Sequence, residues 1–154
     1  MIILIDSGIL GILSNPNESE VNTKCEEWLY NKITKGCTVV TSQICKYEVK
    51  RSLILCQKKN SLQTEGLEKL AELEKLIDFI AITEEDIDIA CQLWADSIIV
   101  GIQVTPQQDI NFDLIICSQW RRLKTESPGR EITIATHNIR HLKRFAQAEL
   151  WENL

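Results

Sequence analysis

Residues 1–10 are MIILIDSGIL, an unbroken apolar run from Met1 to Ile5 followed at once by Asp6. A short, β-branched run without alternation is typical of a strand buried on both faces of a parallel sheet. Open α/β sheets bind their ligands just beyond the carboxyl ends of such strands. Asp6 is therefore expected at the mouth of a site, with Ser7 available to cap the following helix. The competing interpretation is that Asp6 only caps a helix in a strand-to-helix turn.

The composition is that of an ordinary globular protein, with 154 residues, 44% hydrophobic and 25% charged. This length suits one domain covering residues 1–154. No apolar run approaches a membrane span, and the apolar N-terminus has no positively charged leader, so we expect a cytoplasmic protein without membrane contact. The cysteines form no C-x-x-C pair, which predicts buried thiols rather than disulfides or a zinc site. The net charge of −5 argues modestly against a general nucleic-acid binder but allows an enzyme that grips RNA locally.

Strand-like and helix-like segments alternate along the chain. Strands are expected at residues 2–5, 37–41, 79–82 and 132–135, with a short one in the tail. Helices are expected at residues 7–13, 18–35, 43–58, 62–77, 109–124 and 138–146. One more helix is expected to begin after a capping box formed by Thr83 and Asp86. Residues 60–61 and 101–108 are expected to interrupt them. This order predicts an α/β fold, a three-layer α/β/α sandwich whose central parallel sheet has residues 2–5 in the middle and 37–41 beside them.

Two further acids compare with Asp6. Glu48 lies in a helix that follows the second strand, at the margin of its small and apolar face, where a solvated surface glutamate is the simpler interpretation. Asp113 shares a helix with Ile110, Cys117 and Trp120, which form the expected inward face. A carboxylate pointing toward the sheet is costly unless it is paired or bound to a cation, so Asp113 is the least ordinary acid of the chain.

The segment ITIATHN places Thr136, His137 and Asn138 directly after the fourth strand, at the same edge of the sheet as Asp6. Three carboxylates and an amide from separate segments suit a hard divalent cation such as Mg²⁺ or Mn²⁺, which prefers oxygen ligands. Without a cation the clustered acids would repel one another.

The sequence resembles the PIN-domain ribonucleases, which include the toxins of VapBC-type toxin–antitoxin pairs. The motifs that carry the resemblance are IILIDSG, the E-V-x-R segment from Glu48 to Arg51, FDLIICSQ around Asp113, and IATHNIRHLKRF from Ile134. The resemblance covers almost the whole chain and implies a PIN-like fold. It also implies that Asp6, Glu48 and Asp113 surround Mg²⁺ or Mn²⁺ and that RNA is cleaved. The fourth catalytic position, usually Asp or Asn, matches Asn138, and His141 stands where some members have a further Asp.

The mechanism that follows from this resemblance is metal-assisted hydrolysis of RNA phosphodiester bonds. Thr136 or Ser7 would orient the carboxylates, and His141 and Arg51 would contact phosphate, although charged side chains on helices are usually solvated surface. An antitoxin protein is the partner that the toxin resemblance adds.

Two other α/β functions fit the sequence less well. A phosphotransferase of the haloacid-dehalogenase type needs a second Asp where Gly8 stands, and a response-regulator receiver needs an acidic pair that is not visible. A PIN-like domain that has lost catalysis and binds RNA or protein is the alternative that stays open, because Asn138 and His141 stand in place of a fourth acid. We also expect a homodimer, because the four tryptophans exceed what one small core need absorb and aromatic residues are enriched at interfaces.

Overall fold

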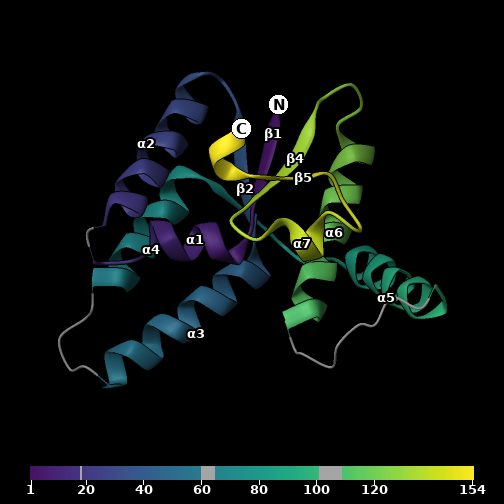
Figure 1. Cartoon of the computed structure of the whole chain (residues 1–154), viewed down its shortest axis with the longest axis horizontal. Coiled ribbons are helices and arrows are strands. Elements are labelled where there is room, and N and C mark those ends of the chain that lie inside the picture. Colours follow the sequence, from purple (N-terminus) through teal and green to yellow (C-terminus); the bar gives the residue numbers. More distant parts are fainter. Residues whose placement is uncertain (18, 60–64, 101–108) are drawn as a thin grey trace.

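The computed structural model describes residues 1–17, 19–59, 65–100 and 109–154 (Figure 1). Within these residues one sheet contains β1 (Ile2–Ile5), β2 (Thr38–Ser42), β3 (Asp78–Ile80), β4 (Ile132–Thr136) and β5 (Ala148–Leu150). The strand order is β3-β2-β1-β4-β5, and every neighbouring pair is parallel. The predicted parallel sheet and the central position of residues 2–5 are confirmed.

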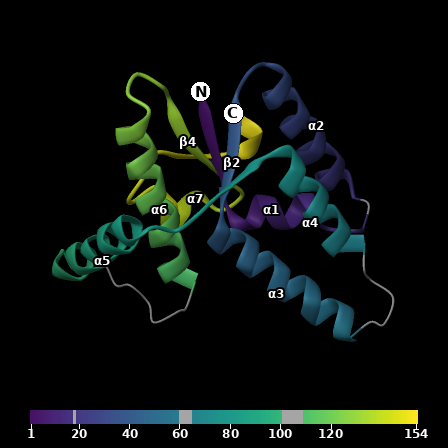
Figure 2. The ribbon, with the colours of Figure 1, turned by 180° about the vertical axis from the view of Figure 1, so that it is seen from behind.

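Helices cover the sheet on both sides. They are α1 (Ser7–Leu13), α2 (Glu20–Thr34), α3 (Gln43–Lys59), α4 (Glu65–Leu76), α5 (Glu84–Ile99), α6 (Asp109–Glu126) and α7 (Ile139–Leu142), followed by a 3₁₀ turn at Trp151–Asn153. Figure 1 shows α1 to α4 to one side of the central strands and α5 and α6 to the other, and Figure 2 shows the same division from behind. The predicted α/β/α sandwich is therefore confirmed.

The central strand is buried as its composition predicts. Ile3, Leu4 and Ile5 are fully inaccessible to solvent, because β2 and β4 flank the strand and helices cover both faces. The register pairs Ile5 with Thr41 on one side and with Ala135 on the other. The residues that follow these three therefore leave the sheet at the same edge, which is where α1, α3 and α7 begin (Figure 1).

Local signals place most of the helix ends. Gly36 follows the end of α2 and has a φ of 80°. Residues with a side chain disfavour this left-handed conformation, so glycine suits the position. The capping box predicted at Thr83 and Asp86 is present, with both of its reciprocal hydrogen bonds. Asp86 is also fully buried and accepts a hydrogen bond of 2.9 Å from Arg122 Nε of α6, a tie between α5 and α6.

Some element bounds differ from the prediction. The last helix was expected at residues 138–146 but covers only Ile139–Leu142, because the chain turns back there to place β5 beside β4. β2 and β3 are displaced by one or two residues. Residues 62–64, where the fourth helix was expected to begin, lie outside the described residues, and the described part of α4 is Glu65–Leu76. The interruptions expected at residues 60–61 and 101–108 lie outside the described residues, and so does the side chain of Ile110.

Most of the tryptophan surface that motivated the homodimer lies inside the molecule. Trp28 and Trp151 are buried and meet edge to face, with ring centroids 5.8 Å apart. Trp120 Nε1 donates a hydrogen bond of 2.9 Å to the carbonyl of Ile132. Trp94 on α5 is 47% exposed. The argument from aromatic surface therefore reduces to Trp94 and its neighbours.

All the cysteines are free thiols. Cys25, Cys45 and Cys117 are buried as expected, but Cys56 and Cys91 are exposed, so the prediction of uniformly buried thiols is wrong. Among the helices that the structure describes, none has the length and apolar character needed to cross a membrane.

Candidate functional site

Asp6 lies at the carboxyl end of β1 and is only 7% exposed. Its Oδ1 accepts a hydrogen bond of 2.9 Å from the backbone N–H of Ile9, so Asp6 itself is the N-cap of α1. The expectation that Ser7 caps this helix is therefore wrong. The reason is that the extended backbone of Asp6, with φ of −82° and ψ of 177°, directs its side chain back over the first turn.

Thr136 holds the other carboxyl oxygen of Asp6. The hydroxyl of Thr136 accepts the backbone N–H of Asn138 at 2.8 Å and donates its own proton to Asp6 Oδ2 at 2.5 Å. Both Thr136 and Asp6 are buried, so this chain of bonds fixes the plane of the carboxyl group. Asn138 contributes through its backbone, since its side chain is exposed and makes no capping bond.

Burial dominates the electrostatics of Asp6. Loss of solvent raises the pKa of the Asp6 carboxyl group, while the hydrogen bonds from Thr136 and Ile9 and the nearby His137 oppose the rise. The ionised form of Asp6 therefore gains from any additional positive charge at this edge of the sheet. A carboxyl group whose pKa is shifted by burial in this way is typical of functional sites.

His137, rather than His141, is the histidine beside Asp6. A Cβ placed on Gly8 would lie 2.1 Å from Nδ1 of His137, so the imidazole occupies the space that this glycine leaves at the first turn of α1. His141 is half-buried on α7, and none of the described hydrogen bonds or ion pairs joins it to an acid. The sequence did contain a signal for this proximity. His137 directly follows the fourth strand, and residues that follow parallel strands lie at the same edge of the sheet as Asp6.

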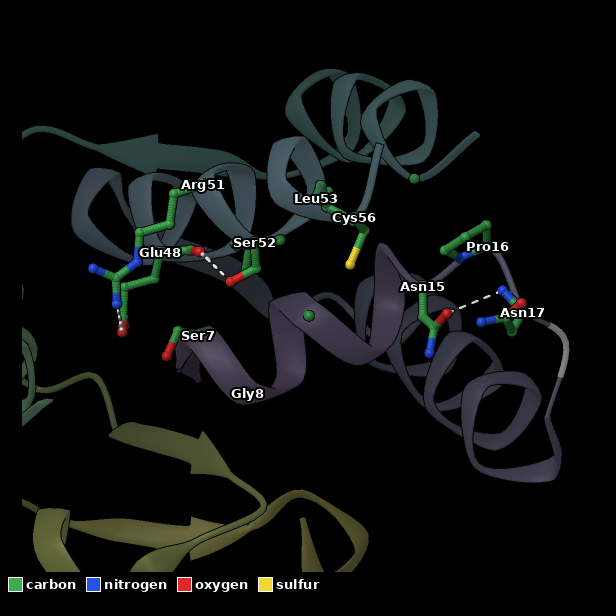
Figure 3. Close-up of a pocket in the computed structure, with 13 residues that line it drawn as sticks. Ser7, Gly8, Asn15, Pro16, Asn17, Glu48, Arg51, Ser52, Leu53 and Cys56 are labelled. Carbon is green, nitrogen blue, oxygen red and sulfur yellow. Dashed lines mark hydrogen bonds and ion pairs between the residues drawn. The ribbon is translucent and has the colours of Figure 1, made fainter. Parts of the chain in front are cut away.

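Glu48 lines a pocket of about 470 Å³ between α1 and α3. Figure 3 shows its side chain and that of Ser7 at the same end of this pocket. The Glu48 side chain is 17% exposed, and its Oε1 lies 3.7 Å from Nη2 of Arg51. Glu48 is therefore a half-buried acid at the wall of a cavity, not the solvated surface glutamate of the simpler interpretation.

Two buried thiols, Cys45 and Cys117, lie near the acids. Burial raises the pKa of Cys45, and the charges of Asp6 and Glu48 raise it further, so both acids act on the same thiol. Burial and then the charge of Asp113 raise the pKa of Cys117, one turn later on α6. Both thiols stay protonated, which excludes them as nucleophiles at neutral pH.

Asp113 is half-buried at the part of α6 that meets α3. Its neighbour Phe112 contacts Tyr47 edge to face, with ring centroids 6.2 Å apart, and Tyr47 directly precedes Glu48. The crossing of these two helices thus brings the segments carrying Asp113 and Glu48 together.

The three acids do not form a closed metal cluster. Across the described ranges, no group of three or more His, Cys, Asp or Glu side chains lies close enough to hold a metal ion. By donor type the set fits, because carboxylate oxygens are the ligands that Mg²⁺ and Mn²⁺ prefer, and because the burial of Asp6 favours a neighbouring cation.

No protein-family model matches the sequence, and no curated protein matches it. Solved structures do match. VapBC2 from Rickettsia felis, bound to a DNA fragment from its promoter, has a TM-score of 0.65 at 20% identity over 98% of this chain and 99% of that chain. VapBC-1 from nontypeable Haemophilus influenzae has a TM-score of 0.65 at 15% identity, and FitAcB from Neisseria gonorrhoeae has 0.63 at 16%, each over 99% of both chains.

These matches extend over nearly the whole of both chains, so this protein has the fold found in the VapBC and FitAcB structures. The resemblance predicted from the sequence motifs is confirmed at the level of the fold, which is PIN-like.

Proposed function

We propose that this protein is a Mg²⁺- or Mn²⁺-dependent endoribonuclease that hydrolyses RNA phosphodiester bonds and acts as the toxin of a toxin–antitoxin pair. The observation that carries the proposal is Asp6, a buried carboxyl group at the end of the central strand, with both of its oxygens oriented by hydrogen bonds. Glu48 at the wall of the adjoining pocket and Asp113 across the α3–α6 contact complete the proposed catalytic set.

Asp6, Glu48 and Asp113 would hold the cation. When bound, the cation supplies charge neutralisation at the scissile phosphate and activation of water. Thr136 keeps the Asp6 carboxylate in one orientation, since its hydroxyl donates to Oδ2. Ser7, which lines the same pocket as Glu48, would contact a phosphate oxygen, and the exposed amide of Asn138 lies at the same edge of the sheet.

The histidine assignment changes in this proposal. His137 lies beside Asp6 at the first turn of α1, so His137 rather than His141 is the histidine expected to contact the substrate phosphate. His141 keeps only the possibility of contacting RNA farther along, which the resemblance suggested.

An antitoxin is the proposed protein partner. The structures that share this fold include VapBC and FitAB, and three of them contain bound DNA. Co-expression of the chain with a small reading frame from the same operon tests this, because the pair should co-purify and lose nuclease activity. The proposed location is the cytoplasm, where such a pair meets cellular RNA.

A homodimer is the proposed assembly, formed through the exposed apolar side of α5. Ile87, Trp94 and Ile98 are each about half exposed there, and Ile99 and Val100 more so. An exposed apolar patch of this kind is typical of an interaction surface. Light scattering at micromolar concentration should give twice the monomer mass, and Trp94→Asp should give the monomer mass.

The experiment that tests the nuclease measures cleavage of a labelled RNA with Mg²⁺, with Mn²⁺ and with EDTA. The variants Asp6→Asn, Glu48→Gln and Asp113→Asn should each reduce the rate by about a hundredfold or more, because each removes a charge that binds the cation. Asp88→Asn, which changes an exposed acid on α5, is the matched control and should cleave at the parent rate. A parent protein that cuts no RNA with either metal would instead favour the catalytically degenerate binding module.

A further inference from the structure

Beside Glu48, the guanidinium of Arg51 lies between two aromatic rings. Its central carbon is 5.6 Å from the ring centroid of Tyr47 and 5.6 Å from that of Phe112. The two rings meet edge to face at an interplanar angle of 78°. Tyr47 and Arg51 lie one turn apart on α3 and Phe112 comes from α6, so the crossing of the helices assembles this cluster. Cation–π contacts of this kind restrict a long side chain to one region.

Within the described residues, the guanidinium donors of Arg51 lack hydrogen-bond partners. The guanidinium has five N–H donors, and no hydrogen bond of its side chain occurs among the described residues. The Arg51 ion pair with Glu48 spans 3.7 Å, which exceeds hydrogen-bond length, and the side chain is 46% exposed. An arginine held by aromatic contacts, with its donors open to solvent beside a proposed catalytic acid, fits a phosphate group in two-point contact.

Tyr47 offers a second kind of contact. Its side chain is 56% exposed although its ring borders both Arg51 and Phe112. Burial of a large exposed ring against another flat group is favourable, and a nucleobase supplies such a group. Exposed aromatic rings next to arginine are the elements with which proteins bind the bases and phosphates of unstacked nucleotides.

We propose that Tyr47, Arg51 and Phe112 form a receptor for one nucleotide of the RNA next to the bond that is cut. Tyr47 stacks on its base, Arg51 binds its phosphate, and Phe112 keeps both side chains in position. This inference rests on the proposed nuclease function and assigns the residues that position its substrate. The ion pair with Glu48 keeps the guanidinium next to a proposed catalytic acid, at the end of the pocket where Ser7 also lies (Figure 3).

The binding test uses a short fluorescein-labelled RNA in EDTA, so that affinity is measured without cleavage. Tyr47→Ala should weaken binding about tenfold, within the range for base–aromatic stacking, and Tyr47→Phe should bind like the parent. On an RNA with one abasic nucleotide, tested at each position along the strand, the difference between the parent and Tyr47→Ala should disappear at one position. Tyr30→Ala is the matched control, because Tyr30 is 58% exposed on α2, where it borders a different pocket.

The salt dependence of RNA binding tests the proposed phosphate contact of Arg51. Loss of one phosphate contact should reduce the slope of log affinity against log salt concentration by about 0.7 for single-stranded RNA. Arg51→Gln should show this reduction, whereas Arg51→Lys should retain the slope and lose affinity, because a lysine cannot make the two-point contact. In the cleavage assay both Tyr47→Ala and Arg51→Gln should raise KM more than they lower kcat.

The outcomes separate the two proposals. If the parent cleaves RNA while Tyr47→Ala and Arg51→Gln bind and cleave like the parent, the receptor is refuted and the nuclease stands. If Tyr47→Ala weakens binding equally on intact RNA and on every abasic RNA, the aromatic cluster is structural and the receptor is refuted. If binding depends on Tyr47 and Arg51 as expected but no metal supports cleavage, the nuclease is refuted and the receptor stands.

Discussion

Replacement of Thr136 by valine removes the hydroxyl that orients Asp6 and keeps the shape of the side chain. Thr136 is fully buried, and its hydroxyl donates to Asp6 Oδ2 at 2.5 Å while it accepts the N–H of Asn138 at 2.8 Å. A hydrogen bond to a charged group contributes about 1.5–3 kcal/mol, and one between neutral groups about 0.5–1.5 kcal/mol. Asn138 is exposed, so water can replace the partner of its N–H at little cost. We therefore expect Thr136→Val to lose about 2 kcal/mol of unfolding free energy at pH 8.

The loss should depend on pH. Burial raises the pKa of Asp6 above its usual value of 3.8, so the folded state loses stability as the pH rises from that value through the folded pKa and Asp6 ionises. The hydrogen bond from Thr136 lowers the pKa and so reduces this loss. Its removal should therefore cost about 1 kcal/mol while Asp6 is protonated and about 2 kcal/mol once Asp6 is ionised.

Urea unfolding between pH 4 and pH 8 measures this difference, and thermal unfolding at pH 8 should show a drop in Tm of about 4–8 °C. The control is Thr133→Val on the same strand. Thr133 is equally buried, but its hydroxyl accepts a neutral hydrogen bond of 3.2 Å from Gln147 Nε2. Thr133→Val should lose about 1 kcal/mol of unfolding free energy at every pH. Equal, pH-independent losses in the two variants would refute the coupling between Thr136 and an ionised Asp6.

Two further predictions concern stability away from the site. Arg122→Gln should cost about 3 kcal/mol in urea unfolding, because it leaves the fully buried Asp86 without its cation, whereas Glu126→Gln should change little at its exposed end of the same network. Gly66→Ala should lower Tm despite the better helix propensity of alanine, because the new Cβ would lie 2.7 Å from a leucine methyl and 3.2 Å from a backbone carbonyl. Gly11→Ala, whose Cβ meets nothing closer than 3.9 Å, is the control and should not lower Tm.

The sequence could predict the sheet because its signal is local. The unbroken apolar run of β1 indicates a strand covered on both faces, and parallel strands place the residues that follow them at one edge. The proximity of Asp6 and Thr136 at one edge of the sheet follows from that rule alone. The length of the last helix does not, because Asn138 to Leu150 must turn back to pair with β4, and this long-range pairing overrides helix propensity.

Contacts that depend on how helices cross could not be predicted in this way. Asp86 and Arg122 are 36 residues apart, and each is an ordinary charged residue in its own helix. The same holds for the cluster of Arg51 with Tyr47 and Phe112, because only the packing of α3 on α6 brings the second ring to the guanidinium. The choice between His137 and His141 depended on the backbone after β4, where Asn138 is not yet helical, with φ of −131° and ψ of 86°.

The two sequence interpretations of Asp6, helix cap and functional acid, are compatible in the structure. Capping uses one oxygen, and the bond from Thr136 uses the other, which leaves lone pairs on both for a further partner. Asparagine or serine would cap α1 about as well without the cost of burying a charge. Capping therefore accounts for a polar residue at this position but not for an acid whose pKa is raised by burial. The negative charge of Asp6 therefore needs a separate explanation, and we propose that it binds a cation shared with Glu48 and Asp113.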